Sequence, residues 1–168
     1  GVDVLISALE RLAASGRRIS ATITGDGVDR AEFEAQAKTA GLSGSICFTG
    51  ALAARKAFRL GRLMVVPSRA ESFPYIILEA IAAHKPLIAS KVGGIGEVLP
   101  PDALVPPGNA EKLATAITAA LDDFSQQQNI ANLRAASLKT SSNAAVMAEN
   151  ICRFYADCLA SGKARKVA

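Results

Sequence analysis

The chain has 168 residues and a mass of 17.4 kDa, the size of a single domain that can bury a substantial core. Hydrophobic residues make up 50% of it and charged residues 20%, which excludes a disordered chain, and 13 Gly with 7 Pro exclude a collagen-like one. The net charge is +4, and Lys163, Arg165 and Lys166 near the end carry three of the positive charges. The body is only weakly basic, which gives no indication of nucleic-acid binding.

The sequence carries no membrane, secretion or metal-site signal. No apolar run approaches the roughly 18 to 20 residues that a membrane-spanning helix needs, and the start from Gly1 to Val4 lacks the pattern of a signal peptide. Cys47, Cys152 and Cys158 are odd in number and have no CxxC spacing, so neither a disulfide framework nor a zinc site is predicted. A reducing, cytoplasmic compartment fits this composition best.

Helix and strand patterns alternate along the first half of the chain. Apolar side chains recur from Val2 to Ala13 with the period of an amphipathic helix, and Gly16 marks the end of that helix. The expected elements, in order, are a helix over 2–15, a strand over 19–24, a helix over 28–40, a strand over 45–49, a short helix over 53–60 and a buried strand over 63–66.

The second half continues the alternation. Its expected elements are a helix over 74–84, strands over 86–90 and 103–105, and helices over 109–123, 129–139 and 142–159. This order with short connections predicts an α/β fold, a Rossmann-like parallel sheet with helices on both faces. A doubly wound domain normally begins with a strand that becomes a central member of its sheet. Here the first predicted element is a helix, so we expect the first strand to be missing.

The segment from Pro67 to Ala83 is the most informative about function. It follows a buried strand, which places its loop at the carboxyl end of the sheet, where open α/β folds bind ligands. We expect Pro74 at the first position of the helix and Ser72 as its cap. The start of this helix offers free backbone N–H groups at Tyr75 and Ile76 and a positive dipole, which suit a phosphate.

Two carboxylates flank this helix start. The helix is apolar nearly all round, which predicts that it is buried, and Glu79 is its one charge. An unpaired buried carboxylate costs several kcal/mol, so Glu79 must meet a basic group, a donor-rich ligand or the solvent of a cleft. Glu71 can reach the same space, and carboxylates that read hydroxyls beside a phosphate site suggest a nucleotide sugar. The alternative is that Glu71 is a solvated loop charge and Glu79 a structural ion pair with Arg69 or Lys85.

The same segment resembles the signature of retaining GT-B glycosyltransferases, family four of the sequence classification, also called group 1. That signature is a strand, Pro-Ser, a first Glu, Phe-Gly, and a second Glu seven intervening residues later, followed by Ala. It stands here as Pro67-Ser68, Glu71, Phe73 and Glu79-Ala80. Further matching segments are Gly25-Asp26-Gly27, Phe48-Thr49-Gly50, Lys85 to Ser90, Val92 to Glu97 and Pro107-Gly108-Asn109. The resemblance covers nearly the whole chain, as the C-terminal, donor-binding half of such an enzyme.

The resemblance implies a role for particular residues. It implies that Glu71 holds hydroxyls of the donor sugar and that Glu79 holds the ribose hydroxyls of the nucleotide. The other residues that it implies at the donor, along the sugar and diphosphate or around the base, are Ser72, Phe73, Pro74, Tyr75, Ile76, Gly25, Gly27, Gly50, Leu52, Arg55 and Lys56. Without the resemblance, the two glycines of Gly25-Asp26-Gly27 indicate a turn more than a direct ligand contact, and the basic run that includes Arg55 and Lys56 indicates a solvated helix face, with contact of one basic group with phosphate as the alternative.

Two positions depart from the family pattern. Pro74 stands where the family usually has Gly, and because proline lacks an N–H donor, Tyr75 and Ile76 remain as the expected donors to phosphate. His84 also stands where the family commonly has Gly, and we expect it to serve the C-terminal end of the helix.

The resemblance further implies that residues 1–168 are one donor-binding domain of a larger enzyme. In the family a strand ending near an Arg and a Lys precedes the first helix of this half, and an N-terminal domain contacts the acceptor. We expect both to lie outside this chain, so that the chain alone is inactive. The helix over 141–160 resembles the one that in the family packs toward the N-terminal domain. We therefore expect an exposed apolar patch there or on the sheet edge, which favours self-association.

The implied activity is transfer of a sugar from a UDP- or GDP-sugar to an acceptor, with retention of configuration and without a metal or other cofactor. The implied process is synthesis of polysaccharide, lipopolysaccharide or glycolipid at the inner face of the cytoplasmic membrane, which a basic tail would approach. One alternative is a non-catalytic flavodoxin-like ligand-binding or regulatory domain, which predicts more acidic residues at the strand ends than Asp26 and Glu71. A nucleotide-sugar epimerase is another, but its catalytic His and acid arrangement is not found. The donor base, sugar and acceptor stay open.

Overall fold

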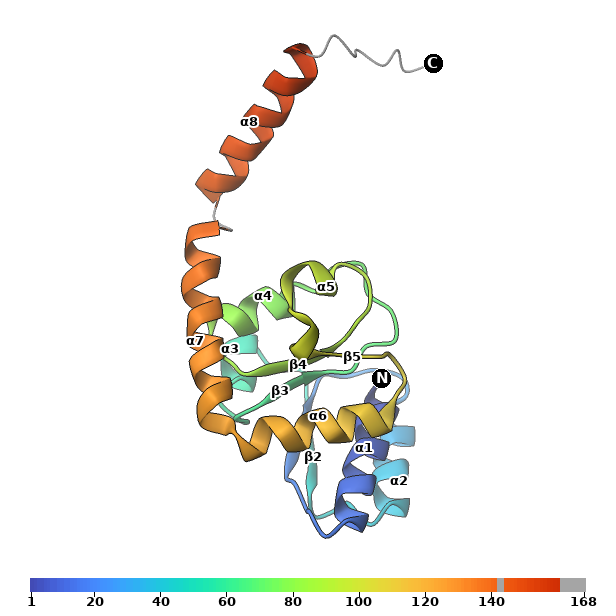
Figure 1. The fold of residues 1–168 in the computed structure, drawn as a ribbon. Helices are drawn as coiled ribbons and strands as arrows, with labels where there is room; N and C mark the ends of the chain where they lie inside the picture. The colour runs from blue at the N-terminus through green and yellow to red at the C-terminus, as the bar shows by residue number, and fades with distance from the viewer. Residues whose placement is uncertain (142–143, 161–168) are drawn as a thin grey trace.

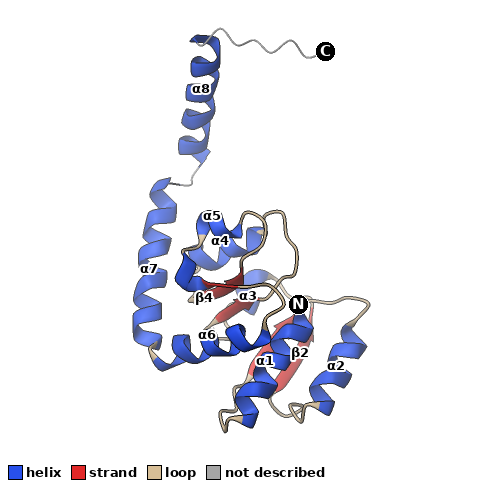
Figure 2. Cartoon of the chain, turned by 45° about the vertical axis from the view of Figure 1, so that its right-hand side comes forward, coloured by secondary structure: helices blue, strands red, loops and turns tan. Residues whose placement is uncertain are grey.

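The computed structural model describes residues 1–141 and 144–160 as an α/β arrangement of helices and parallel strands (Figures 1 and 2). The helices are α1 (Val2–Ala14), α2 (Arg30–Thr39), α3 (Ala54–Ala57), α4 (Tyr75–Ala82), α5 (Ile95–Val98), α6 (Ala110–Asp122), α7 (Phe124–Ser141) and α8 (Ala144–Ala160). The strands are β1 (Ala21–Thr24), β2 (Ile46–Gly50), β3 (Met64–Val66), β4 (Leu87–Ser90) and β5 (Leu104–Val105). Apart from α5 and a 3₁₀ turn over Pro101–Ala103, each corresponds to an element predicted from the sequence.

The strands lie in two parallel sheets. β1 pairs with β2 in the first sheet, and β3, β4 and β5 follow one another in the second. The predicted α/β class with parallel strands is therefore confirmed, and the two sheets are separated between β1 and β3, where the sequence predicts a missing strand. Each of these two strands has one edge without a strand partner among residues 1–141 and 144–160.

Helices cover both faces of the second sheet, as predicted. Alternate residues of β4 point to opposite faces: Ile88 packs in a core cluster with α1 and α6, whereas Leu87 and Ala89 pack with α4 and α5. This alternation is the pleat of a β-strand, and all four residues of β4 are buried. α1 and α6 pack against each other, which joins the start of the chain to the segment after β5.

The last two helices differ in how they contact the body. α7 packs against α4, whereas α8 extends away from the rest of the domain (Figures 1 and 2). The large apolar side chains exposed on α8 are Met147, Ile151, Phe154, Tyr155 and Leu159. The predicted apolar patch is therefore present on this helix. Within residues 1–141 and 144–160, no helix has the length and apolar character needed to cross a bilayer, and the basic tail of Lys163, Arg165 and Lys166 lies outside the described residues.

α4 begins at Tyr75, one residue later than predicted. Pro74 is the N-cap residue, with an extended backbone at φ −79° and ψ 115°, and no side chain caps the helix. The predicted capping by Ser72 is therefore wrong. The carbonyl of Ser72 accepts a hydrogen bond from the Gly94 N–H at 2.8 Å, which joins this loop to the segment after β4.

His84 closes the carboxyl end of α4 in the left-handed region, with φ 56°. Its N–H donates to the Ile81 carbonyl, and the Lys85 N–H donates to the Ala80 carbonyl, both at 2.9 Å. These bonds satisfy carbonyls at the helix end, as glycine at this position commonly allows. The expected role of His84 at the helix terminus is confirmed.

We expect His84→Gly to raise the thermal midpoint and His84→Val to lower it. A side chain in the left-handed region costs about 1 kcal/mol, most for a β-branched residue, and glycine removes that cost. In thermal unfolding followed by circular dichroism, the glycine variant should gain about 2 °C, and the valine variant should lose at least about 4 °C. Asn132→Ala controls for the contact of the His84 ring with Asn132, at 3.0 Å. A valine variant as stable as the parent would contradict the prediction.

Candidate functional site

The candidate site lies at the carboxyl ends of the strands. A cavity of about 870 Å³ opens between β1 and β3, and at this end its lining includes Gly25 after β1, Leu52 after β2 and Ile76 in the first turn of α4. Three of the predicted donor residues, which come from segments far apart in the sequence, therefore meet around one cavity. The short helix α3 contributes Ala54 and Ala57 to the same wall.

The two predicted carboxylates are exposed on the loop and helix that follow β3. Glu71 lies in the loop and accepts a hydrogen bond from the Ser68 hydroxyl at 2.9 Å. Glu79 lies on α4, where Ile77, Ala80 and Ile81 are buried, but its own side chain is exposed to solvent, so only one side of the helix is buried as predicted. Glu79 forms no ion pair with Arg69 or Lys85, the two basic residues proposed as its partners. Arg69 pairs with Asp3 instead, and Lys85 donates to the Gly61 carbonyl at 2.8 Å.

The aromatic and basic residues predicted at the donor site lie outside the lining of this cavity. The rings of Phe73 and Tyr75 meet edge to face, with centroids 6.3 Å apart, and the Tyr75 side chain is 77% exposed. Neither is among the cavity-lining residues. Arg55 and Lys56 lie on the exposed side of α3 and are also outside the lining. The structure therefore gathers Gly25, Leu52 and Ile76 but does not bring the two basic groups to them.

The backbone of Gly93 and Gly94 packs directly against the loop that carries Glu71. The sequence did not predict this contact. A Cβ atom placed on Gly93, which has φ +48°, would lie 2.0 Å from the carbonyl oxygen of Glu71 and 2.5 Å from that of Ser72. A Cβ on Gly94 would lie 2.7 Å from Cδ2 of Phe73. Only glycine allows this close approach of two backbones. In the sequence, the adjacent pair Gly93 and Gly94 was the feature that could have indicated this close approach.

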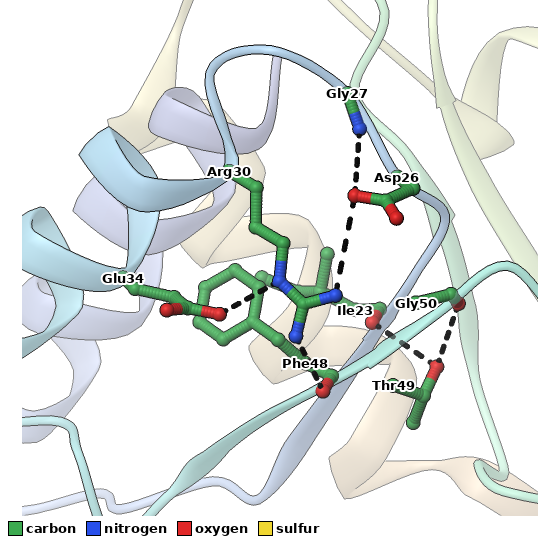
Figure 3. A network of polar contacts seen from close by, with 8 residues as sticks. All are labelled: Ile23, Asp26, Gly27, Arg30, Glu34, Phe48, Thr49 and Gly50. Carbon is green, nitrogen blue, oxygen red and sulfur yellow. Dashed lines mark hydrogen bonds and ion pairs between the residues drawn. The ribbon is translucent and has the colours of Figure 1, made fainter.

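Arg30 joins the ends of β1 and β2 beside the site (Figure 3). Its Nε donates to Glu34 at 2.8 Å, one terminal nitrogen donates to the Phe48 carbonyl at 3.3 Å, and the other lies 4.0 Å from Asp26. The Gly25 N–H donates to the Gly50 carbonyl at 2.9 Å, so these two predicted donor residues are in direct contact. In the sequence, Asp26, Arg30 and Glu34 follow one another at intervals of four residues, and this spacing could have predicted the ion pairs of Arg30.

Asp3 and Arg69 form an ion pair between the first turn of α1 and the loop that carries Glu71. Burial of the Asp3 carboxyl opposes its ionisation, but the hydrogen bond and charge of Arg69 and the nearby amino terminus outweigh this effect. Together they hold the pKa of Asp3 below its ordinary value of 3.8. The pair ties the start of the chain to the site loop.

We expect the Asp3–Arg69 pair to add a small, acid-sensitive contribution to stability. Because the folded-state pKa is lowered, the contribution is present above pH 3.8 and is lost as the pH falls through the folded-state value. Asp3→Asn should therefore lower the thermal midpoint by about 2 °C at pH 7, a small effect because the pair is half exposed. The difference from the parent should be smaller at an acidic pH below 3.8, where the Asp3 carboxyl begins to be protonated, than at pH 7. Asp157→Asn, at an exposed position on α8, serves as the control, and an equal difference at both pH values would contradict the assignment.

Curated relatives of the chain transfer sugars. It is 31% identical over 137 residues to the alpha-D-kanosaminyltransferase of Streptomyces kanamyceticus. This alignment covers 78% of this chain and 36% of that protein. It is 33% identical over 125 residues to the 2-deoxystreptamine glucosyltransferase of the same organism, which covers 70% of this chain and 32% of that protein. The chain thus spans about a third of the length of these relatives.

Solved structures share the fold. The chain matches Anabaena Alr3699/HepE in complex with UDP and glucose with a TM-score of 0.78 at 24% identity, over 91% of this chain and 44% of that one. It matches the C-terminal domain of the group 1 glycosyl transferase LpcC from Francisella tularensis with a TM-score of 0.72 at 25% identity. This match covers 86% of this chain and 80% of that one. The fold is that of the C-terminal, Rossmann-like half of GT-B glycosyltransferases.

The family model described as "Glycosyl transferases group 1" matches residues 1–123. This range includes every predicted site residue, from Gly25 to Glu79, and the elements from α1 to α6 that hold them. The chain therefore belongs to the group 1 glycosyl transferases.

Proposed function

We propose that this chain is the donor-binding domain of a retaining glycosyltransferase of family four, which takes its sugar from a UDP- or GDP-sugar. The observation that carries the proposal is the placement of Glu71 and Glu79. Both carboxylates are exposed, Glu71 on the loop after β3 and Glu79 on α4, outside the lining of the cavity to which Ile76 of the same helix contributes with Gly25 and Leu52. Two exposed acceptor groups on the loop and helix that follow β3 suit a ligand rich in hydroxyls.

In this proposal each part of the donor has its own partner. Glu79 accepts hydrogen bonds from the ribose hydroxyls, and Glu71 accepts them from the sugar and orients it without attacking it. The Ile77 N–H already donates to the Pro74 carbonyl at 3.0 Å, so the N–H groups of Tyr75 and Ile76 are the ones that face the diphosphate. The helix dipole of α4 stabilises the negative charge of the leaving group, and we propose that the domain uses no metal ion.

The comparisons support a nucleotide-sugar donor. Anabaena HepE has been solved with UDP and glucose, with UDP and with UDP-glucose. Since this chain covers 44% of that chain, we propose that the acceptor is bound by another part of a longer enzyme and that transfer requires that part. We further propose a cytoplasmic enzyme that makes polysaccharide, lipopolysaccharide or glycolipid, with contact at the membrane surface.

Calorimetric titration of the chain with UDP, GDP and UMP tests the proposal. We expect one nucleoside diphosphate to bind with a dissociation constant in the millimolar range or below, and UMP to bind about tenfold more weakly, because it lacks the second phosphate that faces α4. Glu79→Gln should lower the affinity about tenfold, since a hydrogen bond to a charged group contributes about 1.5 kcal/mol or more.

The matched control is Glu10→Gln, which removes an exposed carboxylate from the far part of α1. This variant should bind the nucleotides as the parent does. If the parent bound no nucleoside diphosphate, or if Glu79→Gln bound as tightly as Glu10→Gln, the proposed donor site would be wrong.

A further inference from the structure

A second concave surface, which we call the basic hollow, lies at the amino ends of β3 and β4. Its volume is about 420 Å³, and its lining residues are Arg59, Leu60, Gly61, Arg62, Lys85, Phe124 and Gln128. Arg62 comes two residues before β3 and Lys85 two residues before β4, whereas the proposed donor site lies at the carboxyl ends of the strands. The basic hollow adjoins the larger cavity at its amino end, and both linings include Arg62 and Lys85. It is therefore a place separate from the donor site.

The positive charges of the basic hollow have no acidic partner in the protein. Arg59, Arg62 and Lys85 line it together, and no acidic side chain is among its lining residues in the described part of the chain. Within residues 1–141 and 144–160, none of these three cations forms an ion pair with a carboxylate. Like charges that gather without a counter-charge repel one another, so an anion that bound between them would relieve this repulsion.

The acidic residues nearest to the hollow in the sequence are engaged elsewhere. Asp122 and Asp123 directly precede Phe124, whose ring lines the hollow. Asp122 pairs with Arg17 at 2.6 Å, and Asp123 accepts a hydrogen bond from the Gln126 N–H at 3.2 Å in the first turn of α7. The protein therefore leaves the charge of the hollow for an external anion.

Two of the cations are held in place without a ligand. Cζ of Arg62 lies 4.0 Å from the centroid of the Phe124 ring, a cation–π contact that fixes the guanidinium and leaves its N–H groups available. The ammonium group of Lys85 donates to the Gly61 carbonyl at 2.8 Å, which uses one of its three donors. Because both groups are already positioned, a ligand has less side-chain entropy to overcome when it binds them.

The chemistry of these donors suits a phosphate group. The planar guanidinium of arginine matches two phosphate oxygens at once, and a lysine ammonium adds a point charge. Three positive charges suit the nearly two negative charges that a phosphomonoester carries at neutral pH better than the single charge of a carboxylate. Leu60, which is 49% exposed, and Phe124 place apolar surface beside the cations. That surface suits the carbon part of an ester.

We propose that the basic hollow binds the phosphate group of a phosphomonoester. Arg62 and Lys85 donate hydrogen bonds to its oxygens, and Arg59 contributes a third positive charge. The phosphate belongs either to a free metabolite or to a lipid headgroup, and the same donors serve both. Such a ligand joins the connection between α3 and β3 to the start of α7, segments far apart in the sequence, so it should also stabilise the fold.

Calorimetric titration of the whole chain with glycerol 3-phosphate, without nucleotide, tests the proposal. We expect a dissociation constant on the order of 1 mM, and a rise in thermal midpoint of about 3 °C at tenfold that concentration. Arg62→Gln and Lys85→Gln should each weaken binding about tenfold, because each removes a charged donor. Phe124→Leu keeps every charge but removes the ring that positions Arg62, and should weaken binding about threefold.

Lys112→Gln is the matched control. It removes an exposed positive charge from the first turn of α6, at the end of that helix opposite to the hollow. This variant should bind glycerol 3-phosphate as the parent does. So should Glu79→Gln, which separates this result from the proposed donor site. A parent chain that bound no glycerol 3-phosphate, or equal binding by Lys85→Gln and Lys112→Gln, would overturn the proposal.

Flotation with vesicles distinguishes the two sources of the phosphate group. If the ligand is a lipid headgroup, the chain should float with phosphatidylcholine vesicles that contain phosphatidic acid, and Arg62→Gln should float far less. If the ligand is a free ester, the chain should bind glycerol 3-phosphate and stay with the soluble fraction. Equal flotation of Arg62→Gln and Lys112→Gln would come from the net charge of +4 alone and would overturn a role of the hollow at the lipid.

Discussion

Gly93→Ala should lower the thermal midpoint by about 10 °C or more, the largest effect expected of a single substitution in this chain. The new Cβ would lie 2.0 Å from the Glu71 carbonyl oxygen, a backbone atom that cannot move without displacing the loop, and φ at this position is +48°. Steric overlap and left-handed strain therefore add, to at least about 3 kcal/mol. Thermal unfolding by circular dichroism measures the change.

Gly41→Ala separates the two contributions. Gly41 has φ +70°, but nothing lies within 4 Å of the position of its Cβ. This variant should therefore show the left-handed strain alone, about 1 kcal/mol or about 3 °C. In NMR spectra, Gly93→Ala should also shift the amide signals of Glu71 and Ser72, whereas Gly41→Ala should leave them unchanged. Equal losses of stability in the two variants would show that the loop does not rest on Gly93.

Local patterns predicted the elements of the fold well, because each depends on residues near one another in the sequence. The turn at Gly25-Asp26-Gly27, the apolar run of β3 and the helix predicted over 109–123 all belong to this class. In the structure Asn109 caps that helix, α6, and its side chain accepts from the Lys112 N–H at 2.9 Å. The start of α4 was predicted one residue early because Pro74 fits either side of a helix boundary. Its extended ψ of 115° is a property of the folded loop.

The site was predicted in part, and the errors concern contacts between distant segments. The whole of α4 was expected to be buried because it is apolar nearly all round, but Tyr75 and Glu79 are exposed, since composition does not show which side of a helix the rest of the chain covers. The support of Glu71 by Gly93 joins residues 22 positions apart, and only the folded backbone shows it. The separation of the two sheets between β1 and β3 is likewise a relation between distant segments, which local sequence patterns do not show. Sequence patterns identified the residue types of the site, and the structure supplied their neighbours.

Glu71→Gln and Glu79→Gln should change donor affinity in different ways. If Glu79 holds the ribose, Glu79→Gln weakens binding of the free nucleoside diphosphate and of its sugar conjugate by the same factor, about tenfold. If Glu71 holds the sugar, Glu71→Gln weakens only the conjugate, and the free nucleotide binds within about twofold of the parent. The comparison requires titrations of each variant with UDP and UDP-glucose, and with GDP and GDP-mannose.

Ser68→Ala extends this comparison, because the Ser68 hydroxyl donates to Glu71 at 2.9 Å in the structure. Removing that donor leaves the carboxylate charged but frees its orientation, so the affinity for the sugar conjugate should fall less than in Glu71→Gln. The order of conjugate affinities should be parent, Ser68→Ala and then Glu71→Gln, with free nucleotide affinity constant across the three. Because only a carboxylate that touches the sugar produces this order, an equal loss of free nucleotide and conjugate in Glu71→Gln would remove Glu71 from the sugar site.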